Sequence, residues 1–256
     1  MGEIRLGLGV DFLYVGLDVY VGSFTRYYAR DWETVIQQAG RLQGVPVNII
    51  RSQPEPEDRI TDPAEINAGV LGWRAGLNTA LRNAGAIATD VDWDERPDAP
   101  YFTDKPAWDC FGALNLLAAH EEEPKPRFGG RYPKHLSDKW PEDAKYVRRA
   151  ADKASKYAHL YGCEVWLPID MRKTFEGPRP NGQPTRFGSS MRLLEQLSAL
   201  NEATYRGSQA DLEQWRQDMP EGPDPAFEPK AKTGLSIMLA LTKSSVEHRL
   251  PMLLDY

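Results

Sequence analysis

The clearest pattern along the chain is an alternation of apolar and polar side chains over residues 11–22. Successive side chains of a strand point to opposite faces of a sheet, so this alternation predicts a strand. The second face also contains aromatic residues, which predicts a position inside a sheet rather than at its edge. The first face consists of Leu13, Val15, Leu17, Val19 and Val21, and the second includes Phe12, Tyr14 and Tyr20.

Apolar residues at helical spacing follow capping signals at several places in the chain. The strongest start signal is Asp62-Pro63, because an aspartate caps the first backbone N–H groups and proline suits the first helical turn. Residues 107–119 are apolar on nearly all sides, which predicts a buried helix. The predicted helices cover residues 32–42, 63–84, 107–119, 141–161, 190–201, 209–215 and 232–247, and a second short strand covers 45–50.

Residues 161–201 combine a strand, a loop, a second strand and a helix. A strand is predicted over 164–171 and a return strand over 185–187, joined through a loop rich in proline and glycine that suits a hairpin. Ser189 and Ser190 are interpreted as helix caps rather than nucleophiles, because the full Gly-x-Ser-x-Gly pattern is absent. One face of the helix carries Leu193, Leu194, Leu197 and Leu200.

Helices and strands are interleaved along 256 residues, of which 41% are hydrophobic, so a sizeable core is possible. We predict a single α/β or α+β domain over residues 1–256, with a small, mostly antiparallel sheet covered by several helices. Prolines and acids make residues 219–230 an expected exposed connector. One contiguous core is predicted from Leu13, Val15, Leu17, Val19, Trp73, Leu77, Phe111, Leu114, Val165, Leu167, Leu194 and Leu197.

The formal net charge of −6 argues against a nucleic-acid partner, which requires a basic face, and favours a protein partner with a basic surface. No stretch has the length of a membrane span, and residues 1–10 do not form a secretory signal. We therefore expect no membrane association and a cytoplasmic location. Cys110 and Cys163 lie in apolar runs and are expected to be buried free thiols.

The most distinctive polar cluster is the acidic segment from Asp90 to Glu95. In an extended chain its three aspartates point to one side, where their charge would speed encounter with a basic surface. Trp93 would supply an apolar anchor for the same partner. We assign Asp90, Asp92, Trp93, Asp94 and Glu95 as candidate partner-binding residues, and the simpler alternative is a solvated acidic turn.

A divalent-cation site is a competing interpretation of this segment, because carboxylates are ligands for Mg²⁺ and Ca²⁺. The spacing departs from that of a calcium loop. Glu95 stands at the sixth position, where glycine is required, and Tyr101 stands at the twelfth, where glutamate is required. No metal site and no cofactor are therefore predicted.

A second polar cluster, residues 23–30, follows the first strand. Arg26, Tyr27 and Arg30 are candidate anion-binding residues, because guanidinium groups bind phosphate or carboxylate in a forked geometry and ligands often lie beyond strand ends. The alternative is a loop in which the tyrosines pack on the core and the arginines pair with nearby acids.

The sequence contains no Walker loop, no Gly-x-Gly-x-x-Gly and no His-Glu-x-x-His. His159 and Cys163 have the i, i+4 spacing of a helical pair, but Gly162 interrupts the helix.

The sequence favours two classes of function, and a third class is a structural component of a larger assembly. The first is a cytoplasmic acidic binding protein that recognises or neutralises a basic protein, similar in general character, though in no motif, to bacterial immunity proteins. The alternative is an enzyme acting on a phosphorylated or carboxylated small molecule. Arg26 and Arg30 would then clamp the anion, and an acid from the segment 90–95 would serve as base or metal ligand.

Overall fold

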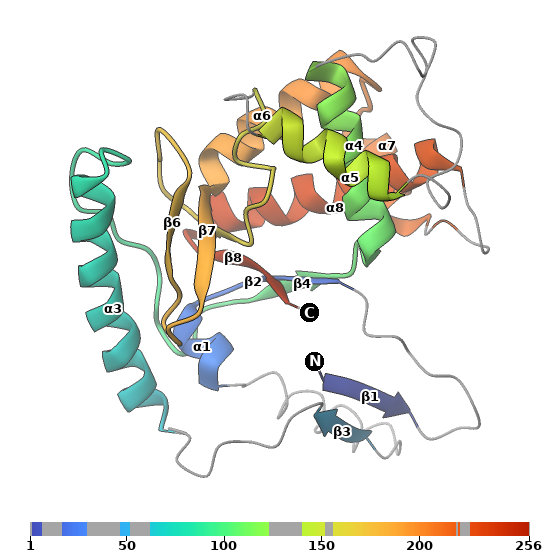
Figure 1. Cartoon of the computed structure of the whole chain (residues 1–256). Coiled ribbons are helices and arrows are strands. Elements are labelled where there is room, and N and C mark those ends of the chain that lie inside the picture. Colours follow the sequence, from blue (N-terminus) through green and yellow to red (C-terminus); the bar gives the residue numbers. More distant parts are fainter. Residues whose placement is uncertain are drawn as a thin grey trace.

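Six strands form a mixed sheet at the centre of the structure (Figure 1). The computed structural model describes residues 2–6, 17–29, 47–51, 62–122, 140–151, 156–218, 220 and 226–255. The sheet order is β4-β2-β8-β5-β7-β6, and neighbours are antiparallel except β5 and β7, which are parallel. The predicted hairpin between strands 164–171 and 185–187 was therefore wrong, because the chain turns back at β6 and the hairpin is β6-β7. The strands span Asp18–Val21 (β2), Phe102–Asp104 (β4), Val165–Leu167 (β5), Phe175–Pro178 (β6), Pro184–Ser189 (β7) and Met252–Asp255 (β8). The predicted fold class, with a mostly antiparallel sheet covered by helices, is confirmed.

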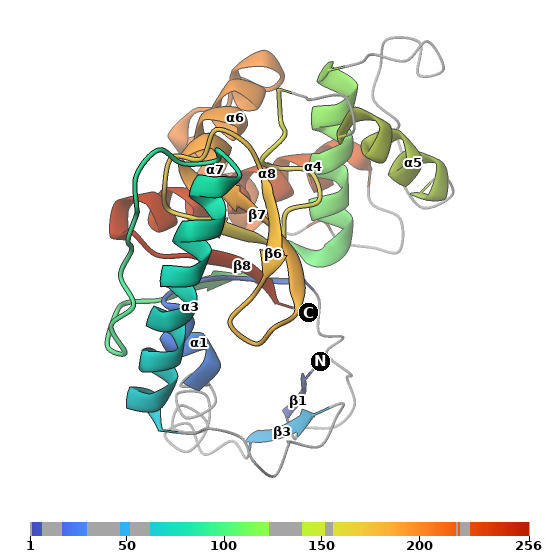
Figure 2. The same cartoon turned by 60° about the vertical axis from the view of Figure 1, so that its left-hand side comes forward.

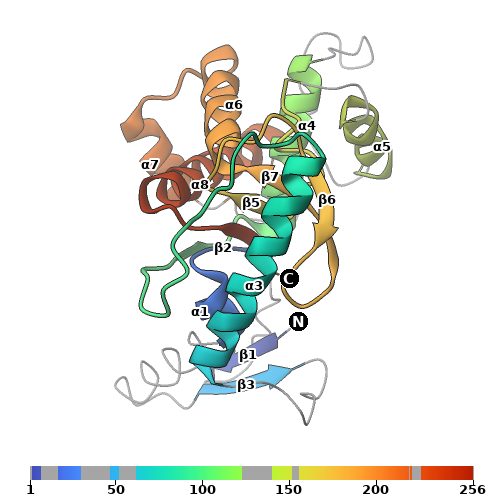
Figure 3. The ribbon, with the colours of Figure 1, turned by 90° about the vertical axis from the view of Figure 1, so that its left-hand side faces the viewer.

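Helices cover both faces of this sheet (Figures 2 and 3). The helices α1 and α3 lie on one face, and α4, α6 and α8 lie on the other. Because successive strand residues point to opposite faces, Tyr20 and Leu253 pack with the α3 layer, whereas Val19 and Leu254 pack with the α8 layer. The helices span Phe24–Ala29 (α1), Pro63–Asn83 (α3), Ala107–Glu122 (α4), Trp140–Ala151 (α5), Ser190–Ala203 (α6), Gln209–Gln217 (α7) and Phe227–His248 (α8).

The prediction of one contiguous core was wrong, because the sheet separates two hydrophobic clusters. Leu17, Val19, Leu114 and Leu197 belong to the cluster under α4, α6 and α8, with Phe111 packed against it. Leu77, Val165 and Leu167 belong to the cluster under α3, with Trp73 packed against it. Leu194 is only partly buried, and Leu13 and Val15 lie outside the described residues.

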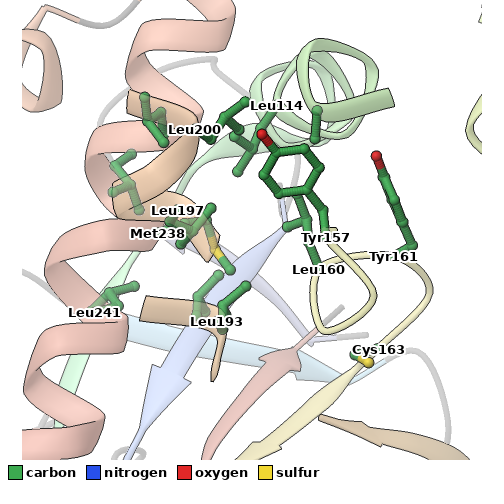
Figure 4. Packing of buried hydrophobic residues seen from close by; sticks show 14 of the residues in the cluster. Leu114, Tyr157, Leu160, Tyr161, Cys163, Leu193, Leu197, Leu200, Met238 and Leu241 are labelled. Carbon is green, nitrogen blue, oxygen red and sulfur yellow. The ribbon is translucent and has the colours of Figure 1, made fainter. Parts of the chain in front are cut away.

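Figure 4 shows part of the larger cluster, in which leucines of α6 meet side chains of α4 and α8. Leu193, Leu197 and Leu200 are fully buried, so the predicted apolar face of this helix is correct at three of its four positions. The helices α4 and α8 lie close together at Gly234. A Cβ at this position would lie 2.3 Å from the carbonyl oxygen of Cys110, so the packing requires glycine.

Helix starts agree well with the capping signals. Asp62 accepts a hydrogen bond from Ala64 N (2.9 Å) at the start of α3. Ser189 Oγ accepts one from Arg192 N (3.1 Å) at the start of α6, which confirms its interpretation as a cap. Ser208 caps α7 in the same way, within a capping box that also involves the side chain of Asp211.

Several element boundaries differ from the predictions. The helix predicted over 141–161 ends at Ala151, and residues 156–162 form turns instead. The last helix begins at Phe227, so residues 227–230 are its first turn and not part of an exposed connector. The strand predicted over 45–50 is β3, Val47–Arg51, which pairs with β1, Gly2–Leu6, in a separate ribbon. The helix predicted over 32–42 lies outside the described residues.

Candidate functional site

The acidic segment 90–95 runs along α3 and is fixed to it by polar side chains of that helix. Three side chains at helical spacing donate to carbonyl oxygens of alternate residues in the segment. These bonds join Asn78 Nδ2 to Val91 O (2.9 Å), Arg74 Nη1 to Trp93 O (2.8 Å) and Asn67 Nδ2 to Glu95 O (2.9 Å). Every second carbonyl oxygen of the segment is an acceptor, which shows that its backbone is extended.

This extended conformation sorts the acidic segment into an outer and an inner side. Asp90, Asp92 and Asp94 share the outer side, as predicted from their spacing. Trp93 and Glu95 point inward and are only 3% and 4% exposed. Both were expected to face a partner, and in this structure neither is available as a surface contact.

Glu95 is held by donors from α1 and from its own segment. Its carboxylate accepts hydrogen bonds from Thr25 N (2.9 Å), Thr25 Oγ1 (3.1 Å) and Trp93 Nε1 (2.5 Å). Burial raises the pKa of Glu95 above the usual range, although these donors act in the opposite direction. Glu95 therefore links the acidic segment to α1 and has a structural role.

The outer side of the acidic segment forms one wall of an open groove of about 500 Å³. The other wall consists of residues 168–170, which follow β5. We call this feature the acidic groove; it is lined by Asp90, Val91, Asp92, Pro168, Ile169, Asp170 and Arg249. Three carboxylates thus border the groove, and of its apolar lining residues Val91 is partly exposed whereas Pro168 and Ile169 are buried.

Each carboxylate of the acidic groove is paired with an arginine. Asp90 binds Arg82 (2.9 Å), Asp92 binds Arg249 (2.7 Å), and Asp170 binds Arg192 (2.7 Å). All of these side chains are at least 40% exposed, and exposed pairs of this kind contribute about 0–1 kcal/mol each. The carboxylates are therefore balanced by contacts that solvent or another cation can replace.

Asp94 lies on the outer side but does not line the groove. Its carboxylate accepts hydrogen bonds from Arg96 Nε (3.0 Å) and Nη2 (2.8 Å), and this contact lowers the pKa of Asp94. Within the part of the chain that the structure describes, no three acidic, histidine or cysteine side chains come close enough to hold a metal ion.

The candidate anion-binding residues are engaged in contacts within the protein. Arg26 Nη1 donates to Ala99 O (2.7 Å), and its guanidinium lies over the ring of Tyr101 (4.4 Å). Tyr27 OH donates to Asp255 (2.9 Å), and Arg30 lies outside the described residues. Arg26 lines a second hollow of about 440 Å³ together with Asp98, whose carboxylate disfavours an anion there.

Within the part of the chain that the structure describes, neither cysteine is suited to act as a nucleophile with a histidine base. Cys110 and Cys163 are buried and free, as predicted, and burial raises their thiol pKa to about 11 and about 12. His159 Nδ1 accepts a hydrogen bond from Ser189 N (3.0 Å), so this nitrogen is not free to act as a base. The thiols are therefore protonated near neutral pH and unsuited to attack.

The sequence did not single out Asp170 or Arg249 as site residues. Asp170 had a signal, because it lies in the last two residues of the predicted strand 164–171, and side chains near strand ends often line sites. Arg249 had none, because its approach to Asp92 depends on how the end of α8 meets the acidic segment.

No protein-family model, curated protein or solved structure matches this chain. In the part of the chain covered by the structure, no helix is both long and apolar enough to cross a membrane.

Proposed function

We propose that this chain is a binding protein whose acidic groove holds a basic side chain of another protein. The observation that supports this best is the position of three carboxylates, from two separate segments, around one groove. Arginine and lysine have the matching chemistry, since an aliphatic stem carries a cationic head. The cationic head would lie in the groove and reach Asp90, Asp92 or Asp170.

The charge of the whole chain supports the same proposal. A net charge of −6 favours encounter with a basic protein, and that attraction weakens as salt is added. The proposed partner-binding residues are Asp90 and Asp92, which the sequence pattern already indicated, together with Asp170. A cytoplasmic location is also part of the proposal, and two free cysteines are compatible with a reducing compartment.

The test measures binding of a fluorescein-labelled hexa-arginine peptide by anisotropy at low and high salt. The triple variant Asp90→Asn, Asp92→Asn, Asp170→Asn removes the carboxylates of the groove. We expect its Kd to rise by roughly tenfold or more, because several charge contacts of about 0.5–1 kcal/mol each are lost.

A matched control removes the same number of charges elsewhere on the surface. Glu202→Gln, Glu213→Gln and Glu247→Gln change exposed acids of α6, α7 and α8 that do not line the groove. This control should alter the Kd by less than about twofold. An equal loss in both triple variants would mean that binding depends on net charge alone, and the proposed site would be wrong.

A further inference from the structure

The acidic groove already contains a guanidinium group, that of Arg249. Arg249 is the C-cap of α8, and its Nη2 donates to both the carbonyl oxygen (2.8 Å) and Oδ1 (2.7 Å) of Asp92. Its own carbonyl oxygen accepts a hydrogen bond from Asp94 N (2.9 Å). The backbone contact fixes where residue 249 lies, and the side chain then reaches across to Asp92.

We infer that Arg249 is a tethered occupant of the acidic groove, which an arginine of the partner displaces on binding. This inference rests on the proposed function and adds its regulation and its partner residue. In the resting protein Arg249 competes for Asp92, so the affinity for a basic segment is lower than the groove itself allows. The contact is thus autoinhibitory.

The form of the Arg249 contact makes it replaceable. Both hydrogen bonds to Asp92 come from one nitrogen, and the two side chains are 64% and 68% exposed. Arg192 differs, because it binds the two oxygens of Asp170 with two nitrogens, Nε (2.7 Å) and Nη2 (3.0 Å). The forked contact is the more specific geometry, so Asp92 exchanges its partner more readily than Asp170 does.

The acceptors at Asp92 favour arginine over lysine as the displacing residue. A carbonyl oxygen and a carboxylate oxygen of the same residue both accept from the guanidinium of Arg249. A guanidinium presents several N–H donors in a rigid plane and can satisfy such a pair with less ordering than a flexible ammonium. The partner class is therefore a protein with an exposed arginine.

The expected size of the autoinhibition follows from the strength of an exposed ion pair. When only a fraction of molecules has a free site, the apparent Kd is the intrinsic Kd divided by that fraction. An exposed pair of ordinary strength leaves roughly one molecule in five open, so removing the Arg249 side chain should tighten binding by up to about fivefold.

Arg249→Gly is the informative variant, because it removes the side chain without straining the backbone. Residue 249 has φ +54°, a conformation that glycine adopts readily, so the folded state should retain its thermal midpoint or gain slightly. We expect this variant to bind hexa-arginine about three- to fivefold more tightly than the unchanged protein, with a smaller gain for hexa-lysine.

Arg206→Gly provides a control with the same change of residue, charge and backbone environment. Arg206 has φ +51°, is exposed, and lies after α6 beside Glu202 rather than in the groove. Its replacement should leave the Kd for hexa-arginine within about 1.5-fold, if the effect is specific to Arg249. Equal tightening in both variants would show a general charge effect and would overturn the inference.

The outcomes also separate this inference from the proposed function. Unchanged affinity of Arg249→Gly, combined with the loss caused by the triple Asn variant, would reject the tethered occupant and leave the groove as the site. Binding that neither the triple Asn variant nor Arg249→Gly alters would reject both.

Discussion

At the scale of single residues, His159 shows how a backbone contact fixes a protonation state. Its Nδ1 accepts the N–H of Ser189 at the start of α6, and the side chain is 4% exposed. A protonated ring carries a hydrogen on Nδ1, so this nitrogen could no longer accept the N–H of Ser189. Burial, together with the nearby positive charge of Arg192, lowers the pKa of His159 to about 4.

This lowered pKa predicts a loss of stability at mildly acidic pH. The unfolded ring titrates near pH 6.5, so the stabilisation is fully present above that pH and is lost as the pH falls toward about 4. His159→Asn places an oxygen near the position of Nδ1 and removes the titration. The free energy of unfolding of each protein is measured with urea at pH 7 and at pH 4. Between these two pH values, the difference in unfolding free energy between the variant and the unchanged protein should change by on the order of 2 kcal/mol.

The matched control for His159 is His248→Asn, which changes a histidine that is exposed and stacks on Phe102. It measures how replacing a histidine by asparagine at another position affects the pH profile. If His159→Asn shows the same pH profile as this control, then His159 does not titrate as its surroundings indicate.

At the scale of elements, glycine has opposite effects in two helices. Gly234 of α8 faces the backbone of α4, where an added Cβ would clash with the Cys110 carbonyl oxygen. Gly72 of α3 is exposed, and an added Cβ there meets no atom within 4 Å. Replacing glycine by alanine at each position should therefore distinguish the effect of close helix packing from the effect of backbone entropy.

We expect Gly234→Ala to destabilise the protein by roughly 2–3 kcal/mol or more, because two rigid backbones must move apart. Gly72→Ala should instead stabilise it by about 0.5–1 kcal/mol through helix propensity. Chemical denaturation of both variants measures this. Equal effects of the two substitutions would mean that α4 and α8 are not in close contact.

Sequence patterns predicted those helix ends that are determined by residues close by in the chain. Asp62 and Ser189 are predictable as caps because capping requires only the following turn of the chain. The strand β8 was missed, since its four residues are too short to show a period and three of them are buried. Leu194 was misplaced because helical spacing does not say how wide the covered face is.

The candidate site was predictable only where it is local in sequence. Asp90 and Asp92 share a side because of alternation within one extended segment. Burial of Trp93 and Glu95 depends on Thr25, Arg74 and Asn67, which come from two other elements. Such pairings are set by tertiary packing, which the pattern of one segment does not contain.

At the scale of the whole molecule, one sheet supplies a wall to both hydrophobic clusters. Leu253 contacts one cluster and the adjacent Leu254 contacts the other, so neither cluster can lose its strand without exposing the second. Unfolding should therefore be one cooperative transition, as expected for a single domain.

This cooperativity is tested by weakening one cluster and observing the other. Leu81→Ala removes a fully buried side chain of α3 and should cost about 2–5 kcal/mol. Cys163 lies in the opposite cluster, and the urea concentration at which its thiol becomes reactive should then fall. This decrease should equal the decrease in the midpoint of unfolding followed by far-ultraviolet circular dichroism. A thiol that remains protected while the dichroism shifts would indicate two independently unfolding units.

The position of β8 has a consequence for how the protein is made. Of the described sheet strands, β8 is synthesised last, yet it lies between β2 and β5. Until residues 252–255 leave the ribosome, the sheet exists only as two halves, β4-β2 and β5-β7-β6, each with an unpaired inner edge. Such edges pair readily with other chains. We therefore expect both inner edges to be open to pairing with other chains until β8 joins the two halves.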